Sequence, residues 1–395
     1  MVERHRHPRR RRWVKRLDAK CKWRAASLDL MAKTASWFDD RERVKEAGMA
    51  KRTVDAGSTH PLLVDLALQG GGSHGAFTWG VLDRLLEEPW LKIEAISGTS
   101  AGAMNGAVLV SGFMQGGAEG ARAALDGYWG RVADSARFSP IQRSPLDRLM
   151  NRWTLDTSLG YLVMDLMSRV VSPYSLNPFG FNPISDILRR SIDFAHLGEA
   201  SIKLFITATN VHTGRGRVFR NKEITPEVLL ASACLPTMFQ AIEIDGEPYW
   251  DGGYVGNPTI TPLVREGEAT DVILVQINPR ERRETPRTAT EILNRLNEIS
   301  FNSPLMKELR MIALLRQAAD PGGGEGARWA RMRTHRIITD RLAEFGASSK
   351  LNAERAFLTL LKEEGRRCTE AFLVEHGDDL GKRSTADIDV LLAEV

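Results

Sequence analysis

Ser100 stands in a setting that can turn a serine into a nucleophile. It is the central residue of the stretch Gly98-Thr99-Ser100-Ala101-Gly102, which fits the pattern G-x-S-x-G. In this pattern the serine lies on a sharp turn between a strand and a helix, and the small residues two positions away let the two elements approach closely. The backbone N–H dipoles at the helix N-terminus favour negative charge beside the hydroxyl. The stretch therefore predicts acyl transfer through a serine.

A second stretch supplies bare backbone upstream of the serine motif, since residues 70–75 read GGGSHG. The N–H groups of Gly70, Gly71 and Gly72 can point at the oxyanion of a tetrahedral intermediate. The same glycines also satisfy G-x-G-x-x-G, the fingerprint of a dinucleotide-binding turn, for which Glu94 would be the ribose-binding acid. Glu94, however, lies inside a predicted strand, and the serine motif occupies the place where the ribose would bind. We favour an oxyanion hole and keep a nicotinamide-dependent oxidoreductase as the weaker alternative.

A serine nucleophile needs a base, and the eight histidines of the chain lie in no recognisable triad motif. A carboxylate is the other candidate. Asp251 follows a predicted hairpin over residues 243–250 and precedes Gly252 and Gly253. Taken alone, Asp-Gly-Gly is most often a simple turn. Asp251 becomes a candidate base only in combination with the two other motifs.

The three motifs, in this order, resemble those of the patatin-like phospholipase family, which uses a Ser-Asp dyad in place of a triad. The stretch LLASACLPTMFQ at residues 229–240 is also similar to the family's small-residue helix that ends in a proline. The resemblance covers residues 61–280 clearly and the helical region beyond them more loosely. It implies that Ser100 is the nucleophile, that Asp251 is the base and that the backbone of residues 70–72 forms the oxyanion hole.

The glycines that shape these motifs complete the predicted site, and they are Gly75, Gly98, Gly102, Gly252 and Gly253. His74 departs from the family pattern, because many members carry Arg or Lys there, so a preference for anionic head groups is not implied. The chemistry needs no metal and no organic cofactor. The implied reaction is hydrolysis of a lipid carboxylic ester through an acyl-enzyme, by a phospholipase A or a lipid esterase. A catalytically weak lipid-binding protein of the same fold is the alternative.

Short apolar strands alternate with helices in the part of the chain that carries these motifs. Strands are predicted over residues 64–69, 91–96, 204–211 and 272–277, and helices over residues 76–87 and 101–113. Buried, β-branched strands separated by helices are typical of a mostly parallel sheet that is covered on both faces. With the resemblance, we expect an α/β protein with a three-layer α/β/α patatin-like fold, a mostly parallel central sheet and a helical C-terminal extension.

Composition divides the chain into three parts. Residues 1–58 are predicted to be a basic, disordered extension, with a surface anchor for anionic lipid as the functional alternative. Residues 59–320 are expected to form the catalytic domain, and residues 321–395, which begin at the break PGGGEG, a helical extension. The apolar stretch at residues 155–183 is predicted either to pack on the sheet as a helix or to form a cap over a lipid-like acyl chain.

The overall charge argues against a nucleic-acid partner. The formal charge is +4, but residues 1–16 hold eight Arg or Lys against one Glu and so carry +7, which leaves −3 for the other 379 residues. The three cysteines, Cys21, Cys234 and Cys368, match no metal or redox spacing, which favours a reducing compartment. No apolar run reaches the length of about 18 residues that a membrane span needs. We expect a cytoplasmic protein that binds a lipid or ester substrate and docks peripherally on the inner face of a membrane.

Overall fold

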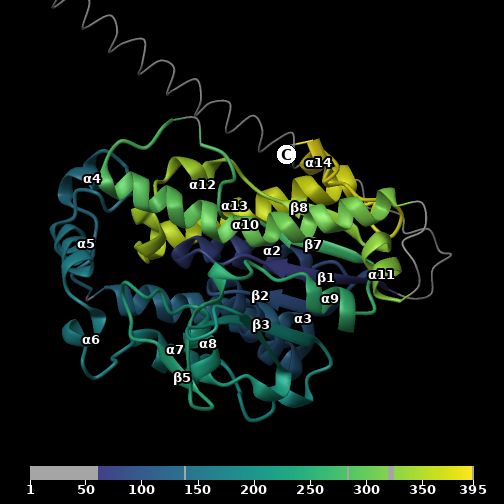
Figure 1. Ribbon diagram of the computed structural model, residues 1–395, viewed down its shortest axis with the longest axis horizontal. Helices are drawn as coiled ribbons and strands as arrows, with labels where there is room; N and C mark the ends of the chain where they lie inside the picture. Colours follow the sequence, from purple (N-terminus) through teal and green to yellow (C-terminus); the bar gives the residue numbers. More distant parts are fainter. Residues whose placement is uncertain (1–60, 138, 283, 319–323, 394–395) are drawn as a thin grey trace, which may run out of the picture. The chain divides into compact units, whose positions relative to one another are not determined.

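A central sheet with helices on both sides organises the chain (Figure 1). The computed structural model describes residues 61–137, 139–282, 284–318 and 324–393. The predicted N-terminal extension, residues 1–58, lies outside the described residues. Within them, strands follow the order β5-β6-β3-β2-β1-β7-β8, and β4 pairs with β3. The strands are β1 (Leu62–Leu68), β2 (Leu91–Gly98), β3 (Lys203–Asn210), β4 (Gly216–Arg220), β5 (Ile242–Ile244), β6 (Glu247–Asp251), β7 (Asp271–Val275) and β8 (Arg333–Ile337).

The sheet is mostly parallel, as the sequence predicts. β3, β2, β1, β7 and β8 run parallel to one another, whereas β4, β5 and β6 pair antiparallel at the β3 side. The central strands β1 and β7 are apolar at nearly every position and are buried over most of their length, because helices cover both faces of a parallel sheet. The carboxyl ends of β1 and β2 therefore meet at one edge, where the glycine loop and the serine motif follow them.

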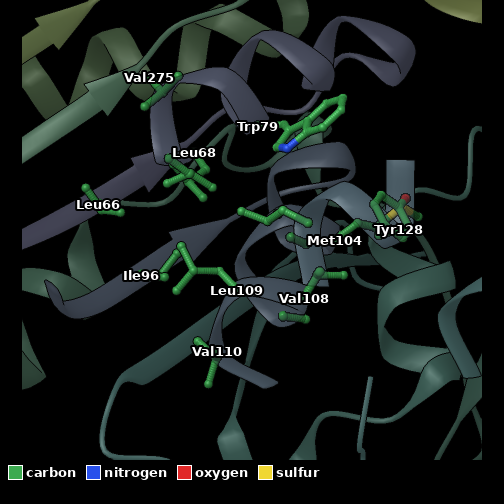
Figure 2. Packing of buried hydrophobic residues seen from close by; sticks show 14 of the residues in the cluster. Leu66, Leu68, Trp79, Ile96, Met104, Val108, Leu109, Val110, Tyr128 and Val275 are labelled. Atoms are coloured by element: carbon green, nitrogen blue, oxygen red, sulfur yellow. The ribbon is translucent and has the colours of Figure 1, made fainter. Parts of the chain in front are cut away.

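Alternate residues of β1 face two separate hydrophobic clusters, which gives three layers. Leu66 and Leu68 pack with α2 (Gly75–Leu85), α3 (Ala101–Ala136) and α13 (Arg355–His376), together with α7 (Pro183–Ser191) and α8 (Pro226–Ser232). Figure 2 shows this side of the sheet, where Leu66, Leu68, Ile96 and Val275 gather with Met104, Val108 and Leu109. Ala67 faces the other cluster, which α9 (Thr261–Glu266), α10 (Ala289–Gln317), α11 (Glu325–Arg331) and α14 (Val390–Ala393) complete. The predicted α/β/α fold is confirmed.

Residues 114–182 contain more helix than the sequence predicts. α3 extends to Ala136, well beyond residue 113, and bends at Gly116 and Gly117, whose backbone angles are not helical. Three further helices precede α7, namely α4 (Pro145–Leu149), α5 (Leu159–Val170) and α6 (Pro173–Leu176). The apolar stripe of α5 is exposed, so this helix is not packed on the sheet through it. No described helix is both long enough and apolar enough to cross a membrane.

Residues beyond 320 belong to the same layered structure as the rest of the described chain. The sequence predicts a helical C-terminal extension without naming a strand in it, but β8 adds a parallel strand beside β7. Its sequence, RTHRI, lacks a continuous apolar run because Arg333 forms an ion pair and His335 a hydrogen bond with the buried Asp271. α12 (Arg341–Glu344) and the short 3-10 helix η5 (Ser348–Leu351) then lead into α13.

α13 packs closely against α2 through two glycines. A Cβ atom on Gly80 would lie 1.9 Å from the backbone oxygen of Lys362, and one on Gly365 would lie 2.1 Å from the backbone oxygen of Phe77. Backbone cannot retreat as a flexible side chain can, so these positions have no room for a methyl group. The C-terminal region is thereby held against the helix that follows the glycine loop.

We predict that Gly80→Ala destabilises the protein by about 2 kcal/mol, because the added methyl group overpacks the contact between α2 and α13. Gly130→Ala is the matched control, since Gly130 also lies in a helix but has no heavy atom within 4 Å of the point that a methyl group would occupy. That substitution should stabilise the protein by about 0.5–1 kcal/mol through helix propensity alone. Denaturant unfolding of the two variants measures both effects, and equal stabilities would contradict the close packing.

Candidate active site

Ser100 lies on a strained turn between β2 and α3. Its backbone angles are φ 54° and ψ −122°, which a residue with a side chain rarely adopts. The neighbouring glycines explain how the turn closes. A Cβ atom on Gly98 would lie 2.7 Å from the backbone of Gly102, and one on Gly102 would lie 2.1 Å from the oxygen of Leu68. Steric crowding thus explains why both predicted motif positions are glycine. The turn places Ser100 at the N-terminus of α3.

Hydrogen bonds from distant segments hold this turn. The Ser100 N–H donates to Oγ of Ser232 over 2.9 Å, and that hydroxyl donates to the backbone oxygen of Thr207 over 2.8 Å. The hydroxyl of Thr99 donates to the backbone oxygen of Gly256 over 2.7 Å. Sequence reasoning did not assign roles to Ser232 and Thr99. Ser232 lies within the small-residue stretch at residues 229–240, which was the only signal that pointed toward it.

Asp251 ends β6 and is brought to the serine. Its side chain is 2% exposed and accepts a hydrogen bond from the Gly253 N–H over 2.7 Å. Burial raises the pKa of Asp251 to about 7, although the bond from Gly253 and the nearby Ser100 hydroxyl act in the opposite direction, which places the carboxyl group close to the serine. Gly252 must lack a side chain, because its Cβ would lie 2.0 Å from the oxygen of Thr207 on β3.

The glycine loop lies against the serine. A Cβ atom on Gly70 would lie only 2.6 Å from Cβ of Ser100. The Gly70 N–H donates to Oδ1 of Asn257 over 2.7 Å, and its oxygen accepts from Nδ2 of Asn278 over 2.6 Å. Two buried asparagines thus fix the peptide groups of Gly70. Neither asparagine was predicted, because each comes from a distant segment without a local motif.

The next two glycines present their N–H groups differently. Among the described residues, neither the Gly71 N–H nor the Gly72 N–H has a hydrogen-bond acceptor. Gly72 has φ +59°, and a Cβ atom there would lie 2.4 Å from the oxygen of Lys350 in η5. Gly75 completes the motif at the start of α2, where its Cβ would lie 2.7 Å from Cβ of Ala101. Gly70, Gly72 and Gly75 therefore all occupy positions where an added side chain would meet a neighbouring segment.

His74 fixes the glycine loop to the C-terminal region. Its Nε2 lies 2.7 Å from Oγ of Ser349, and this hydroxyl donates its own hydrogen to the Gly346 oxygen over 2.7 Å. Oγ of Ser349 must therefore accept from the imidazole, which places the proton of His74 on Nε2. Burial, together with the smaller effect of the nearby cations Lys350 and Arg282, lowers the pKa of His74 to about 3. His74 is a neutral, structural side chain.

The other described histidines have partners of their own. His196 pairs with Asp193, His212 with Glu247, His335 with Asp271, and His376 with Asp379. His196 and His212 are exposed on the surface. The hydrogen bonds of the described histidines do not include Ser100 or Asp251.

The structure does not place an acid where a dinucleotide site would need one to bind the ribose. Glu94, which would bind the ribose, lies within β2 and forms an ion pair with Lys203, whose Nζ is 2.5 Å from Oε1. Its other carboxylate oxygen accepts from the Glu268 N–H over 3.1 Å. Glu94 is thus engaged in an ion pair away from the glycine loop. The described residues also contain no cluster of three or more His, Cys, Asp or Glu side chains that could hold a metal ion.

Comparison with known proteins agrees with this architecture. The fold belongs to the three-layer α/β/α class, and the sequence profile of the family described as "Patatin-like phospholipase" matches residues 66–264, just over half of the chain. The protein belongs to the patatin-like phospholipase family, which places it among the lipid acyl hydrolases. No curated protein matches the sequence. The crystal structure of VipD from Legionella pneumophila is similar to 81% of this chain and 73% of its own, with 16% identity and a TM-score of 0.32.

The neutral state of His74 predicts a pH-dependent stability. An unfolded histidine has a pKa of about 6.5, so between that pH and about 3 the unfolded chain binds a proton that the folded chain does not. Stability is therefore lost as the pH falls through this window, by up to about 1.4 kcal/mol per pH unit. Between about pH 7 and about pH 5, His74→Gln should lose about 2 kcal/mol less than the wild-type protein.

Urea unfolding at the two pH values measures this difference. His196→Gln is the control, because Asp193 raises the pKa of the exposed His196, so this variant should lose at least as much stability as the wild-type protein when the pH falls. A His74→Gln protein that loses as much stability as the wild type would show that the folded state binds the proton after all.

Proposed function

We propose that this protein hydrolyses carboxylic esters of lipids, as a phospholipase A or lipid esterase, with Ser100 as nucleophile and Asp251 as base. The observation that carries the proposal is the proximity of a serine on a strained turn to a buried carboxyl group, whose pKa the serine hydroxyl lowers. The family supports a lipid acyl substrate. The two described cysteines, Cys234 and Cys368, are free thiols, which fits the cytoplasm as the place of action.

The acylation step transfers one proton through Asp251. Oγ of Ser100 attacks the ester carbonyl carbon while its proton moves to the Asp251 carboxylate. The carbonyl π electrons move onto oxygen, and the resulting oxyanion accepts hydrogen bonds from backbone N–H groups. When the tetrahedral intermediate collapses, the C–O bond to the alcohol breaks and Asp251 returns the proton to the leaving oxygen. The acyl group remains on Ser100.

Deacylation repeats these steps with water. A water molecule gives its proton to Asp251 and attacks the acyl-enzyme, and Ser100 leaves with the proton that Asp251 returns. An ordinary aspartate is a weak base, but burial raises the pKa of Asp251 to about 7. Near neutral pH such a group is partly ionised and still has substantial proton affinity, which suits a general base.

This proposal assigns fewer N–H donors to the oxyanion hole than the sequence analysis does. All of Gly70, Gly71 and Gly72 were candidates, but the Gly70 N–H is already bonded to Asn257. The N–H groups of Gly71 and Gly72 have no acceptor among the described residues and are therefore the assigned donors. Gly70 has a different role, because its lack of a side chain lets the loop approach Ser100.

We predict that Asp251→Asn is about as damaging as Ser100→Ala, with each lowering kcat by several orders of magnitude, about 10⁴-fold or more. The asparagine keeps the shape of the side chain but cannot accept the serine proton. His196→Ala and His212→Ala should change kcat only mildly, since both histidines are exposed and pair with other acids.

The measurement is the turnover number on a short-chain aryl ester, with folding checked by circular dichroism. If His196→Ala or His212→Ala matched Ser100→Ala while Asp251→Asn stayed active, a conventional Ser-His-acid mechanism would have to replace the dyad.

A further inference from the structure

α5 exposes an apolar stripe that a helix of a soluble domain would normally bury. Its exposed side chains follow helical spacing along one face: Leu159, Leu162, Val163, Leu166 and Val170 are 77%, 48%, 52%, 56% and 73% exposed. Tyr161 is the one buried residue of this helix. The helix is thus held by another face, and its apolar stripe is left in contact with solvent.

The exposed apolar surface continues past α5. Tyr174, Leu176, Phe179 and Phe181 are all exposed, and the two phenylalanines reach 95% and 70%. Of the 21 large hydrophobic side chains that are exposed in the described residues, twelve lie between residues 146 and 181. This clustering exceeds the scattered apolar exposure that is normal on protein surfaces. We call α5 and residues 171–181 together the apolar face.

The loop that carries the two phenylalanines has a defined hydrogen-bonded structure. The side chain of Asn177 donates to the Phe181 oxygen over 2.8 Å and accepts from the Phe181 N–H over 2.9 Å. Gly180, with φ +62°, donates to the Asn177 oxygen over 3.0 Å. Hydrogen bonds within the loop therefore fix its backbone, while both aromatic rings are exposed to solvent. The exposure of the rings follows from the conformation of this turn.

The apolar face is connected directly to the Asp251 side of the site. Nε2 of Gln240 donates to the Asn177 oxygen over 2.6 Å, and the Ala241 N–H donates to the Tyr174 hydroxyl over 3.2 Å. The Gln240 oxygen accepts from Sγ of Cys234, whose own oxygen accepts from the Asp251 N–H over 2.9 Å. A short chain of hydrogen bonds thus joins the phenylalanine loop to the proposed base.

The exposed charged residues in this part of the chain are mostly arginines. Of the exposed charged residues between 145 and 190, five are arginines and two are aspartates, namely Arg148, Arg152, Arg169, Arg189 and Arg190 with Asp156 and Asp186. Three of the arginines also pair with further acids, Arg148 with Glu354, Arg169 with Asp165 and Arg189 with Glu227. Exposed arginines beside an apolar surface favour anionic lipid head groups.

We propose that the apolar face inserts into the surface of a lipid bilayer, with Phe179 and Phe181 as the deepest side chains, and so delivers ester substrate to the neighbouring site. The inference rests on the proposed function for the identity of the substrate. It assigns the membrane contact to a defined surface within the described chain, independent of residues 1–58. Aliphatic and aromatic side chains of this kind bind bilayers by burying apolar area at the head-group boundary.

The test measures partition onto vesicles of phosphatidylcholine and phosphatidylglycerol by co-sedimentation. Ser100→Ala protein is used throughout, so that the vesicles stay intact. Phe179→Ser/Phe181→Ser in this background should partition about 100-fold more weakly, because two large apolar side chains no longer enter the lipid. Leu159→Ser/Leu166→Ser should also weaken partition. Leu314→Ser/Val374→Ser is the matched control, with side chains that are 55% and 60% exposed on α10 and α13, and it should partition like the parent.

Catalysis is measured separately, in the background with Ser100 intact. Phe179→Ser/Phe181→Ser should keep the wild-type kcat on a soluble short-chain ester but lose activity on the vesicles. Vesicle partition that depends on the phenylalanines, in a protein that hydrolyses no ester, would support the apolar face and refute the proposed function. Equal partition of the phenylalanine and control variants would overturn the apolar face, whatever the esterase activity.

Light scattering of the free protein distinguishes a second copy as occupant. A monomer at all concentrations is expected. A concentration-dependent dimer that Phe179→Ser/Phe181→Ser abolishes would show that the face binds another copy of the chain, and would overturn its assignment to lipid.

Discussion

The structure depends on one buried contact, the close approach of the Asp251 carboxyl group to Ser100. Burial of Asp251 disfavours its charged form and raises its pKa, while the nearby Ser100 hydroxyl and the bond from the Gly253 N–H favour that form. Several features of the fold exist to make this contact close. Gly98 and Gly102 allow the sharp turn at the serine, Gly252 lets the acid approach β3, and the short hairpin of β5 and β6 carries the acid to the sheet edge.

The C-terminal part of the chain supports the same site from the other side. η5 contacts the glycine loop through Ser349, which binds His74, and through Lys350, which donates to Asn278 and so supports the peptide oxygen of Gly70. Ser348 of the same short helix accepts from the Leu155 N–H, just before α5. One four-residue segment, η5, therefore contacts both the glycine loop and the residues that lead into α5. A helical extension with no role at the site would not have these contacts.

Local patterns predicted the parts of the fold and site that depend on local geometry. Ser100 and its neighbouring glycines could be named because a sharp strand-to-helix turn demands particular residues within a few positions. Asp251 could be named only through the resemblance of the three motifs together to the patatin-like family. Asn257, Asn278 and Ser232 could not be named, since each acts on a segment far away in sequence and carries no motif. β8 was missed because two of its polar residues, Arg333 and His335, bind a buried aspartate and interrupt the apolar pattern. For α5, the periodicity indicates a helix but not whether its apolar stripe faces the core or the solvent.

The central claim is that Asp251 itself, without a histidine, activates Ser100. The most direct test is the pH dependence of inactivation by a fluorophosphonate ester, with the modified serine identified by peptide mapping. The account predicts that Ser100 alone is labelled, that the rate rises with pH to a plateau with a midpoint near the pKa of about 7 for Asp251, and that Asp251→Asn loses this reaction while His74→Gln keeps its midpoint. An unchanged profile in Asp251→Asn, or a midpoint that disappears when a histidine is replaced, would contradict it.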